Sequence, residues 1–503
     1  MKAHVAPAAA DAHYLPPEQV FAAGQRNHHI SNTAYPIAHE RTWGPYRQAD
    51  RSAYPALIAD AFSDVAAMSL YVHIPFCEVR CAFCEYTVVS GKQLLQTDVY
   101  RDALLQEIAA YGSLLGQGPA HPIRGIDIGG GTPAFVPADD IARILDALRA
   151  QFDCGADGLG GGISIETTPR IAAAEPEKLH AWRRSGIERV SMGIQVIQPD
   201  LLKILGRDGN GLEHHQRAVG HIRNAGFERF NIDVMYGFAD QSLQSLAATM
   251  AHTIALNPEY ITLYRMRYKL TRISHQAPRV DLAMVKAHAK LAREQLEAAG
   301  YQANPGKNTF VHHRVLTAKD VGTSAYLRNR VIAGTPYLGM GLGAQSFTHR
   351  SISYNDGAVG KNLSPYLRAI NTGEFPIQDF YQLPLAHMMA KFVAVAFYFG
   401  EIDRVAFRDK FGLELEQAFS EQLNYVKKHG LMCESQGQSD TSAALSLTEL
   451  GAQNFSSVIA LFFAPSVQQY LIERDPETAS DMKRHRDRAE RVVRAANAVV
   501  AMA

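Results

Sequence analysis

Between residues 68 and 299, apolar segments of strand length alternate with amphipathic segments of helix length. The predicted strands cover residues 68–74, 125–129, 162–167, 188–194, 229–235 and 259–266. The predicted helices cover residues 97–112, 137–151, 174–185, 213–225, 241–256 and 281–299. Apolar strands joined through helices favour a parallel sheet with right-handed crossovers. Six such units predict an open, partial (β/α)6 barrel that binds ligands at the carboxyl ends of its strands.

The remainder of the 503-residue chain divides into segments of different character. The N-terminal part is rich in Ala, His, Tyr and Pro, and the segment after the barrel looks irregular. The C-terminal part is mainly helical and contains LSLTELGAQNF, which is typical of a strand entering a helix in a winged-helix-like unit. We therefore expect an α/β protein with an N-terminal extension (1–67), a barrel (68–300), an accessory region completing the core (301–380), a helical C-terminal domain (381–470) and a helical tail (471–503).

Charge and composition exclude several classes of function. Lys plus Arg and Asp plus Glu both number 50, so no overall attraction to nucleic acid or anionic lipid is expected. No apolar run approaches the roughly 20 residues of a membrane helix, and we see no secretion signal. Five cysteines in a chain of this length argue against a disulfide framework. We predict a cytoplasmic protein that binds neither nucleic acid nor membranes.

Three of the five cysteines, Cys77, Cys81 and Cys84, follow the first predicted strand with the spacing C-x3-C-x2-C. Three thiolates on one loop can hold three irons of a [4Fe–4S] cluster and leave the fourth iron open to a methionine moiety. Two plainer interpretations are a group of buried thiols and part of a zinc site, which normally takes a fourth Cys or His ligand. Cys154 and Cys433 stand alone in the sequence, which favours packing over ligation.

Polar residues and glycines follow the later strands. The motif GGGTP, Gly129 to Pro133, can expose backbone N–H groups to a ligand, or it can be a tight turn. Glu166 ends the third predicted strand, Gln195 follows the fourth, and Asp233 lies near the end of the fifth. Each could be a solvated strand terminus, yet successive parallel strands would bring all three to one rim. Arg207 follows Gln195 twelve residues later.

The sixth predicted strand runs into YRMRYKLTR, residues 264–272. Charged and larger apolar side chains alternate there, which places them on opposite faces of a strand. The charged face favours recognition of an anionic group such as a carboxylate, and a solvated strand edge is the alternative. The charged residues are Arg265, Arg267 and Lys269; the others are Tyr264, Met266 and Tyr268.

The ordered set LYVHIPFC, GGGTP, SIETTP, RVSMGIQ, NIDVMYG and LGMGLGAQSF resembles the radical S-adenosylmethionine (SAM) family of oxygen-independent coproporphyrinogen III oxidases and their relatives. The resemblance runs from about Tyr35 to Phe455. It implies that Cys77, Cys81 and Cys84 ligate the [4Fe–4S] cluster. The positions it implies for SAM contact are Tyr71, Gly130, Gly131, Thr132, Glu166, Gln195, Arg207 and Asp233.

The resemblance has further implications for ligands and partners. Some members of the family bind two SAM molecules, and in those Tyr264 and Met266 would lie near the second one. A small-molecule substrate and a reducing partner such as flavodoxin or ferredoxin are also implied.

One departure from the oxidases decides which function we expect. The oxidases continue their motif as Cys-Gly-Cys, whereas here Glu85 and Tyr86 follow Cys84. We therefore expect transfer of a methyl or methylene group from a second SAM to an sp² carbon of a natural product, as in C-methylation or cyclopropanation. The alternatives are oxidation or rearrangement of a tetrapyrrole, a haem chaperone, and a purely structural cysteine cluster. Thr33-Ala34-Tyr35-Pro36 resembles a segment of the oxidases that the chaperones lack, which argues against a chaperone.

Overall fold

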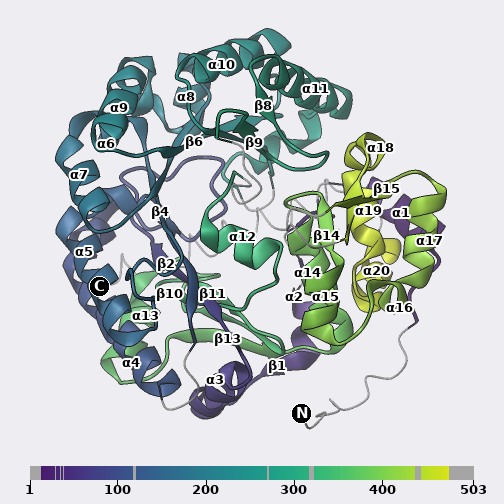
Figure 1. Ribbon diagram of the computed structural model, residues 1–503, viewed down its shortest axis with the longest axis horizontal. Coiled ribbons are helices and arrows are strands. Elements are labelled where there is room, and N and C mark those ends of the chain that lie inside the picture. Colours follow the sequence, from purple (N-terminus) through teal and green to yellow (C-terminus); the bar gives the residue numbers. More distant parts are fainter. Residues whose placement is uncertain are drawn as a thin grey trace, which may run out of the picture.

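The predicted parallel strands are present and follow one another in the sheet in chain order. The computed structural model describes residues 13–474 apart from 29, 34, 38, 117–120, 269–270, 316–321 and 437–442. The parallel strands are β2 (Met68–Ile74), β3 (Ile123–Gly130), β4 (Ile163–Thr167), β5 (Arg189–Gln195), β6 (Arg229–Tyr236) and β7 (Tyr260–Arg265). The partial (β/α)6 barrel is thereby confirmed, and Figure 1 shows its helices in an arc around the strands.

The helices of the arc bury their apolar faces against the strands. They are α4 (Thr97–Leu115), α5 (Ala138–Gln151), α6 (Pro169–Ala174), α7 (Pro176–Arg184), α8 (Pro199–Leu205), α9 (Leu212–Asn224), α10 (Leu243–Ala255) and α11 (Leu282–Ala298). The predicted helix 174–185 is wrong at its beginning, because α7 starts at Pro176 and the separate helix α6 precedes it. Proline has no N–H to donate within a helix, so it favours the first helical position.

The region predicted to be irregular, 300–380, instead supplies strands on both sides of the barrel strands. Strand β10 (Tyr337–Met340) pairs in parallel with β2, and antiparallel strands β11 (Gln345–Phe347), β12 (Ser351–Asn355) and β13 (Ile377–Gln382) follow it. The short β1 (Arg47–Gln48) pairs with β13. At the other edge, β9 (Thr309–His312) pairs with β7 and β8 (Tyr301–Gln302) pairs with β9. These strands are short, so their local pattern is weak.

The turn after β10 explains the glycines of LGMGLGAQSF. Gly341 has φ +97°, and a Cβ there would lie 2.6 Å from the carbonyl oxygen of His73. Its N–H donates to the buried carboxylate of Glu107 over 2.8 Å, and the hydroxyl of Tyr366 donates to the same carboxylate over 2.6 Å. The turn is therefore fixed directly behind β2, the strand that leads into the cysteine loop.

The C-terminal unit combines helices with a small antiparallel sheet. Its strands are β14 (Glu401–Asp403), β15 (Met432–Gln436) and β16 (Ala443–Leu447). Its helices are α14 (Leu385–Ala396), α15 (Arg404–Phe411), α16 (Leu415–Ala418), α17 (Ser420–Lys428), α18 (Glu449–Gln453), α19 (Phe455–Leu461) and α20 (Pro465–Glu473). Strand β16 leads into α18, as LSLTELGAQNF predicted. Of the predicted tail 471–503, residues 475–503 lie outside the described residues.

The N-terminal segment packs on this C-terminal unit, as Figure 1 shows at the right of the molecule. Helix α1 (Pro17–Arg26) lies so close to α19 that a Cβ on Gly24 would come within 2.8 Å of the Ser456 carbonyl oxygen. The buried ring of His387 also receives hydrogen bonds at Nδ1, from the Trp43 indole over 3.0 Å and at 2.9 Å from the Tyr35 hydroxyl. The other helices of the described chain are α2 (His39–Thr42), α3 (Tyr54–Phe62), α12 (Ala325–Val331) and α13 (Leu363–Asn371).

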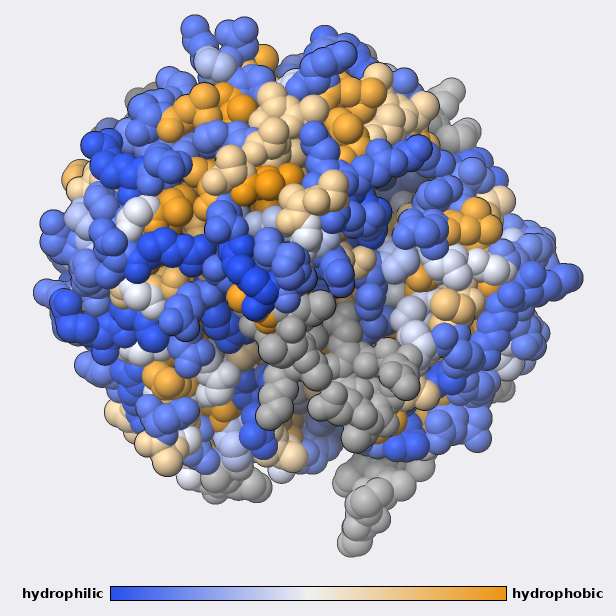
Figure 2. Space-filling view, turned by 45° about the horizontal axis from the view of Figure 1, so that its top comes forward, coloured by the Kyte–Doolittle hydropathy of each residue, from blue (hydrophilic) through white to orange (hydrophobic). Residues whose placement is uncertain are grey.

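Hydrophilic residues cover most of the face in Figure 2, and hydrophobic residues gather in its upper part. Among the helices that the structure describes, none combines the length and the apolar character needed to cross a membrane.

Candidate functional site

A large cavity opens where the parallel strands end, and it reaches the accessory region and the C-terminal unit. Its volume of about 3870 Å³ exceeds the roughly 300–1,000 Å³ that hold one small ligand. Most strand positions are buried, so the accessible ones show which side chains face the cavity. Those that line it are Tyr71 on β2, Asp127 on β3, Glu166 on β4, Gly193 and Gln195 on β5, Asp233 on β6 and Tyr264 on β7. The rim predicted from the sequence therefore exists, and Asp127 belongs to it as well.

The three clustered cysteines line this cavity on the loop after β2. Cys77 is buried, with Sγ 3.2 Å from the hydroxyl of Thr132. Arg207 Nη1 donates to Cys81 Sγ over 3.5 Å, and the Cys84 N–H donates to the Cys81 carbonyl over 3.2 Å. Burial raises the pKa of Cys77 to about 12 and also raises the pKa of Cys84. Ligation would therefore need the positive charge of a metal to stabilise the thiolates.

The donor set suits a cluster better than a single zinc ion. Among the described residues, no three His, Cys, Asp or Glu side chains converge on a point that one metal ion could occupy. A cubane spreads its protein ligands over separate irons, so three thiols that face one cavity without converging fit it. Tetrahedral zinc would need four converging ligands. The residues fit a [4Fe–4S] group held by Cys77, Cys81 and Cys84.

The glycine motif at the end of β3 packs closely against the start of the cysteine loop. Gly130 has φ +136°, and a Cβ there would lie 2.5 Å from the Ile74 carbonyl oxygen. The N–H of Gly131 donates to that same carbonyl over 2.9 Å, and the N–H of Thr132 donates to the Phe76 carbonyl over 2.9 Å. The sequence left open exposed N–H groups or a tight turn here, and the N–H groups of Gly131 and Thr132 are bonded within the protein. Glycine is required at position 130 because the backbones of β2 and β3 approach closely there.

Three carboxylates face the cavity beside Tyr71. A Cβ on Gly129 would lie 3.2 Å from the Tyr71 hydroxyl and 3.4 Å from Glu166 Oε1, so Tyr71 and Glu166 flank the same backbone. Burial raises the pKa of Glu166 to about 8, and the negative charges of Asp233 and Asp127 contribute smaller increases. Burial raises the pKa of Asp127 to about 6 and also raises that of Asp233. Such a group of acids favours a cationic ligand, because a positive charge lets all of them ionise.

Asp233 and Glu166 accept hydrogen bonds from different groups. Asp233 accepts hydrogen bonds from Ser191 Oγ over 3.0 Å and from Asn231 Nδ2 over 2.8 Å. Glu166 is held by a backbone hydrogen bond from Gly130. The cation Arg189, buried on β5, lowers the pKa of all three acids. Sequence reasoning missed Arg189 and Asp127; Asp127 was detectable as a lone polar residue near the end of an apolar strand.

Gln195 and Arg207 lie between the acids and the cysteines. Gln195 has φ +69°, at a register shift between β5 and β6. Arg207 Nη2 donates to the Gly193 carbonyl over 2.5 Å, while its other nitrogen reaches Cys81. One guanidinium thus connects the end of β5 to the cysteine loop, although the two residues it joins are far apart in the chain.

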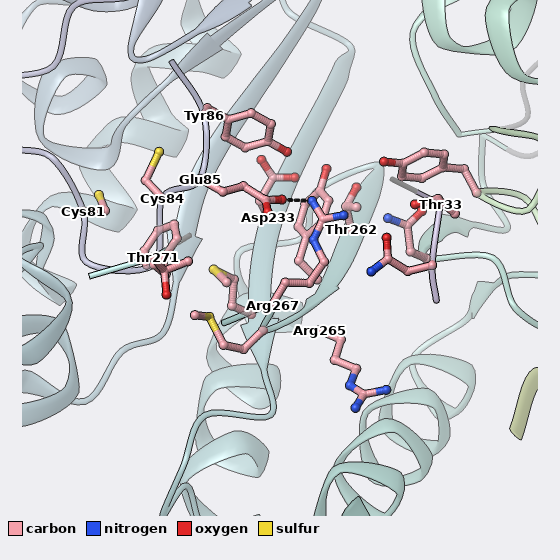
Figure 3. A pocket seen from close by; sticks show the side chains of 18 of the residues that line it. Thr33, Cys81, Cys84, Glu85, Tyr86, Asp233, Thr262, Arg265, Arg267 and Thr271 are labelled. Atoms are coloured by element: carbon pink, nitrogen blue, oxygen red, sulfur yellow. Dashed lines mark hydrogen bonds and ion pairs between the residues drawn. The ribbon is translucent and has the colours of Figure 1, made fainter. Parts of the chain in front are cut away.

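The structure at the end of β7 differs from the charged strand face that the sequence predicted. The strand ends at Arg265, so the alternation does not continue, and Lys269 lies outside the described residues. Arg267 forms an ion pair with Glu85 of the cysteine loop, whereas Arg265 points away from that pair (Figure 3). Tyr264 is 39% exposed and faces the cavity; Met266 also lines it but packs among apolar side chains.

The raised pKa of Glu166 predicts a pH-dependent stability in the protein without cofactors. A carboxyl whose pKa rises from 4.5 to about 8 on folding stabilises the fold below pH 4.5, and this contribution is lost as pH rises toward 8. We expect Glu166→Gln to unfold at a higher temperature than the unchanged protein at pH 8, with the difference shrinking toward pH 5. Water in the cavity screens the charge, so the difference should be small. Equal midpoints of thermal unfolding at all pH values would contradict this.

Comparisons with known proteins show which proteins this chain resembles. Residues 71–252 match the family model described as the radical SAM superfamily. The chain is 32% identical to oxygen-independent coproporphyrinogen III oxidase of Salmonella typhimurium over 240 residues, which is 47% of this chain and 50% of that protein. It is 24% identical to the heme chaperone HemW of Bacillus subtilis over 380 residues, 73% of this chain and 93% of that protein.

The fold has a counterpart among solved structures. Coproporphyrinogen III oxidase (HemN) from Escherichia coli superposes with a TM-score of 0.67 at 24% identity, over 86% of this chain and 96% of that one. The sequence match spans about half the length of the first curated relatives. The radical SAM match over residues 71–252 indicates a [4Fe–4S] cluster and SAM as the cofactors.

Proposed function

Since the chain contains a radical SAM domain in residues 71–252, we propose that it is an enzyme that cleaves SAM reductively and transfers a methyl or methylene group from a second SAM to an sp² carbon of a small molecule. When bound, the cluster and SAM supply a 5′-deoxyadenosyl radical, which this proposal directs to the methyl group of the second SAM. A one-electron donor such as flavodoxin or ferredoxin would reduce the cluster.

The observation that carries the proposal is the structure of the segment after Cys84. Where the resemblance calls for a further cysteine, Tyr86 stands with 58% of its surface exposed to the cavity. Glu85 is held by the ion pair with Arg267, and its carbonyl accepts a 2.7 Å hydrogen bond from Lys361. The segment is thus fixed while its tyrosine borders open space, and the size of the cavity supports a second cofactor-sized ligand beside Tyr264 and Met266.

The binding roles of the chain's residues would follow from their charges. We propose that Tyr71, Glu166 and Asp233 hold the cationic part of SAM, since carboxylates with raised pKa values gain most from a positive neighbour. Arg207 would orient the cysteine loop against the end of β5 through its two hydrogen bonds. The remaining proposed contacts are Gly130, Gly131, Thr132 and Gln195, with Tyr264 and Met266 for the second SAM.

Oxidation of a tetrapyrrole is the second candidate, and two observations favour it. The relatives include coproporphyrinogen III oxidases. Arg and Lys side chains also outnumber Asp and Glu among the residues that line the cavity, which suits a substrate with several carboxylates.

One labelling experiment separates the candidates. The protein is reconstituted with iron and sulfide without oxygen, reduced, and given SAM with a trideuterated methyl group. Mass analysis of the 5′-deoxyadenosine should show deuterium if the radical attacks a second SAM. Unlabelled 5′-deoxyadenosine would contradict alkylation and favour hydrogen abstraction from another molecule. An intact cluster that yields no 5′-deoxyadenosine, together with stable haem binding, would favour a chaperone.

A further inference from the structure

A guanidinium lies among tyrosines on the cavity wall. Arg330 is on α12, which Figure 1 shows inside the ring of strands. The guanidinium carbon lies 4.7 Å from the centre of the Tyr337 ring and 5.9 Å from the centre of the Tyr326 ring. Both tyrosines and Arg330 line the cavity. The helix is held tightly in place, because a Cβ on Gly125 of β3 would come within 2.4 Å of the Tyr326 nitrogen.

Arg330 has no acidic partner within the described chain. No described carboxylate lies within the 4.0 Å of an ion pair, and its Nε is buried without a hydrogen-bond partner. The groups that stabilise its charge are the hydroxyls of Tyr337, Tyr326 and Tyr398. The nearby Asp127 is instead hydrogen-bonded to Ser324 over 2.8 Å. Arg267, by contrast, is already neutralised by Glu85.

A second buried cation strengthens the positive potential here. Lys391 is 4% exposed and donates to the Tyr35 carbonyl over 2.9 Å. Burial, followed by the charge of Arg330, lowers the pKa of Lys391 to about 7. A positive charge on Lys391 adds to that of Arg330, and a bound anion would lower the cost of burying this charge.

We propose that Arg330, held between Tyr326 and Tyr337, binds a carboxylate group of the substrate. A planar guanidinium pairs with a carboxylate through two parallel hydrogen bonds. The buried rings of Tyr326 and Tyr337 fix the position of the guanidinium. The Tyr326 ring lies 5.9 Å from the ring of Tyr71, which adjoins Glu166. A substrate anchored at Arg330 would therefore extend toward the proposed SAM contacts, so this inference rests on the proposed function.

The test uses the full chain without SAM and small naphthalene probes. Binding of 2-naphthoate, 2-naphthylmethanol and 2-naphthyl phosphate is measured by saturation-transfer NMR. We expect 2-naphthoate to bind, the neutral alcohol to bind far more weakly, and Arg330→Gln to weaken 2-naphthoate roughly tenfold to hundredfold. Arg330→Lys keeps the positive charge but not the planar pair of N–H donors. Its affinity for 2-naphthoate should therefore fall between those of the unchanged protein and Arg330→Gln.

The matched control is Arg328→Gln, because Arg328 is exposed on the same helix and does not line the cavity. It should bind 2-naphthoate like the unchanged protein. Arg330→Gln should keep its midpoint of thermal unfolding, since it removes a charge without a counterion. Absence of 2-naphthoate binding, equal binding by Arg330→Gln, or stronger binding of the phosphate would each overturn the proposal.

SAM cleavage separates this inference from the proposed function. Without substrate, the reconstituted unchanged protein and the Arg328→Gln control should both form 5′-deoxyadenosine. If neither forms it while carboxylate binding depends on Arg330, the proposed function fails and the carboxylate site stands. If both form it and binding is independent of Arg330, the carboxylate site fails alone.

Discussion

Cys77→Ala is expected to abolish cluster binding and the reductive cleavage of SAM. Cys77 is the first cysteine of the loop that follows β2, and Thr132 of the glycine motif contacts its sulfur at 3.2 Å. Removing one of three thiolates leaves an iron without its protein ligand, so the cubane should not be retained. After anaerobic reconstitution we expect iron to fall from about four per chain to near zero. Formation of 5′-deoxyadenosine should fall below detection. Cys81→Ala and Cys84→Ala should behave in the same way.

Cys154 and Cys433 provide the controls for this loss. Cys154 is buried among apolar side chains and Cys433 is exposed on β15, and neither lines the cavity. Cys154→Ala and Cys433→Ala should therefore keep full iron content and SAM cleavage. Retention of a SAM-cleaving cluster by Cys77→Ala, or its loss in Cys433→Ala, would show that the ligands have been assigned wrongly.

Gly130→Ala is expected to have the second largest effect. An alanine at φ +136° costs of order 1–3 kcal/mol in backbone strain. Its Cβ would also lie 2.5 Å from the Ile74 oxygen and 2.9 Å from the Ile74 nitrogen, both backbone atoms that cannot rotate away. The β3 turn must then move off β2, which withdraws Thr132 from Cys77. We expect a lower midpoint of thermal unfolding and at least a tenfold loss of SAM cleavage, a factor that corresponds to roughly 1.4 kcal/mol.

Substitutions at two other glycines distinguish the effect of backbone strain from the effect of steric contact. Gly226 has φ +84°, and no atom lies within 4 Å of the position that a Cβ would take, so Gly226→Ala carries the strain without the collision. Gly220 lies within α9 with similar open space, and Gly220→Ala should stabilise the helix by up to about 1 kcal/mol. SAM cleavage should persist in both. If Gly130→Ala resembles Gly226→Ala in stability and activity, the close contact between β2 and β3 does not matter.

The amino-acid sequence alone determined the barrel strands, the cysteine loop and the rim of Glu166, Gln195 and Asp233. These features depend on spacing within short segments and on the rule that parallel strands end on one side, so they can be read locally. The same reasoning failed for β10, whose place beside β2 depends on pairing between distant segments. It also left open whether the N–H groups of Gly131 and Thr132 face a ligand, because their acceptors lie on the neighbouring strand and its loop.

Only the tertiary structure decided which charges are neutralised. Arg267 and Arg330 are both arginines close to tyrosines in the sequence, yet Glu85 pairs with the first and no described acid pairs with the second. Whether a cation meets an acid depends on which loops and helices the fold brings within a few ångströms, and residue order does not record that distance. The local pattern therefore fixed where the chemistry takes place, while long-range packing fixed the charges and the space that surround it.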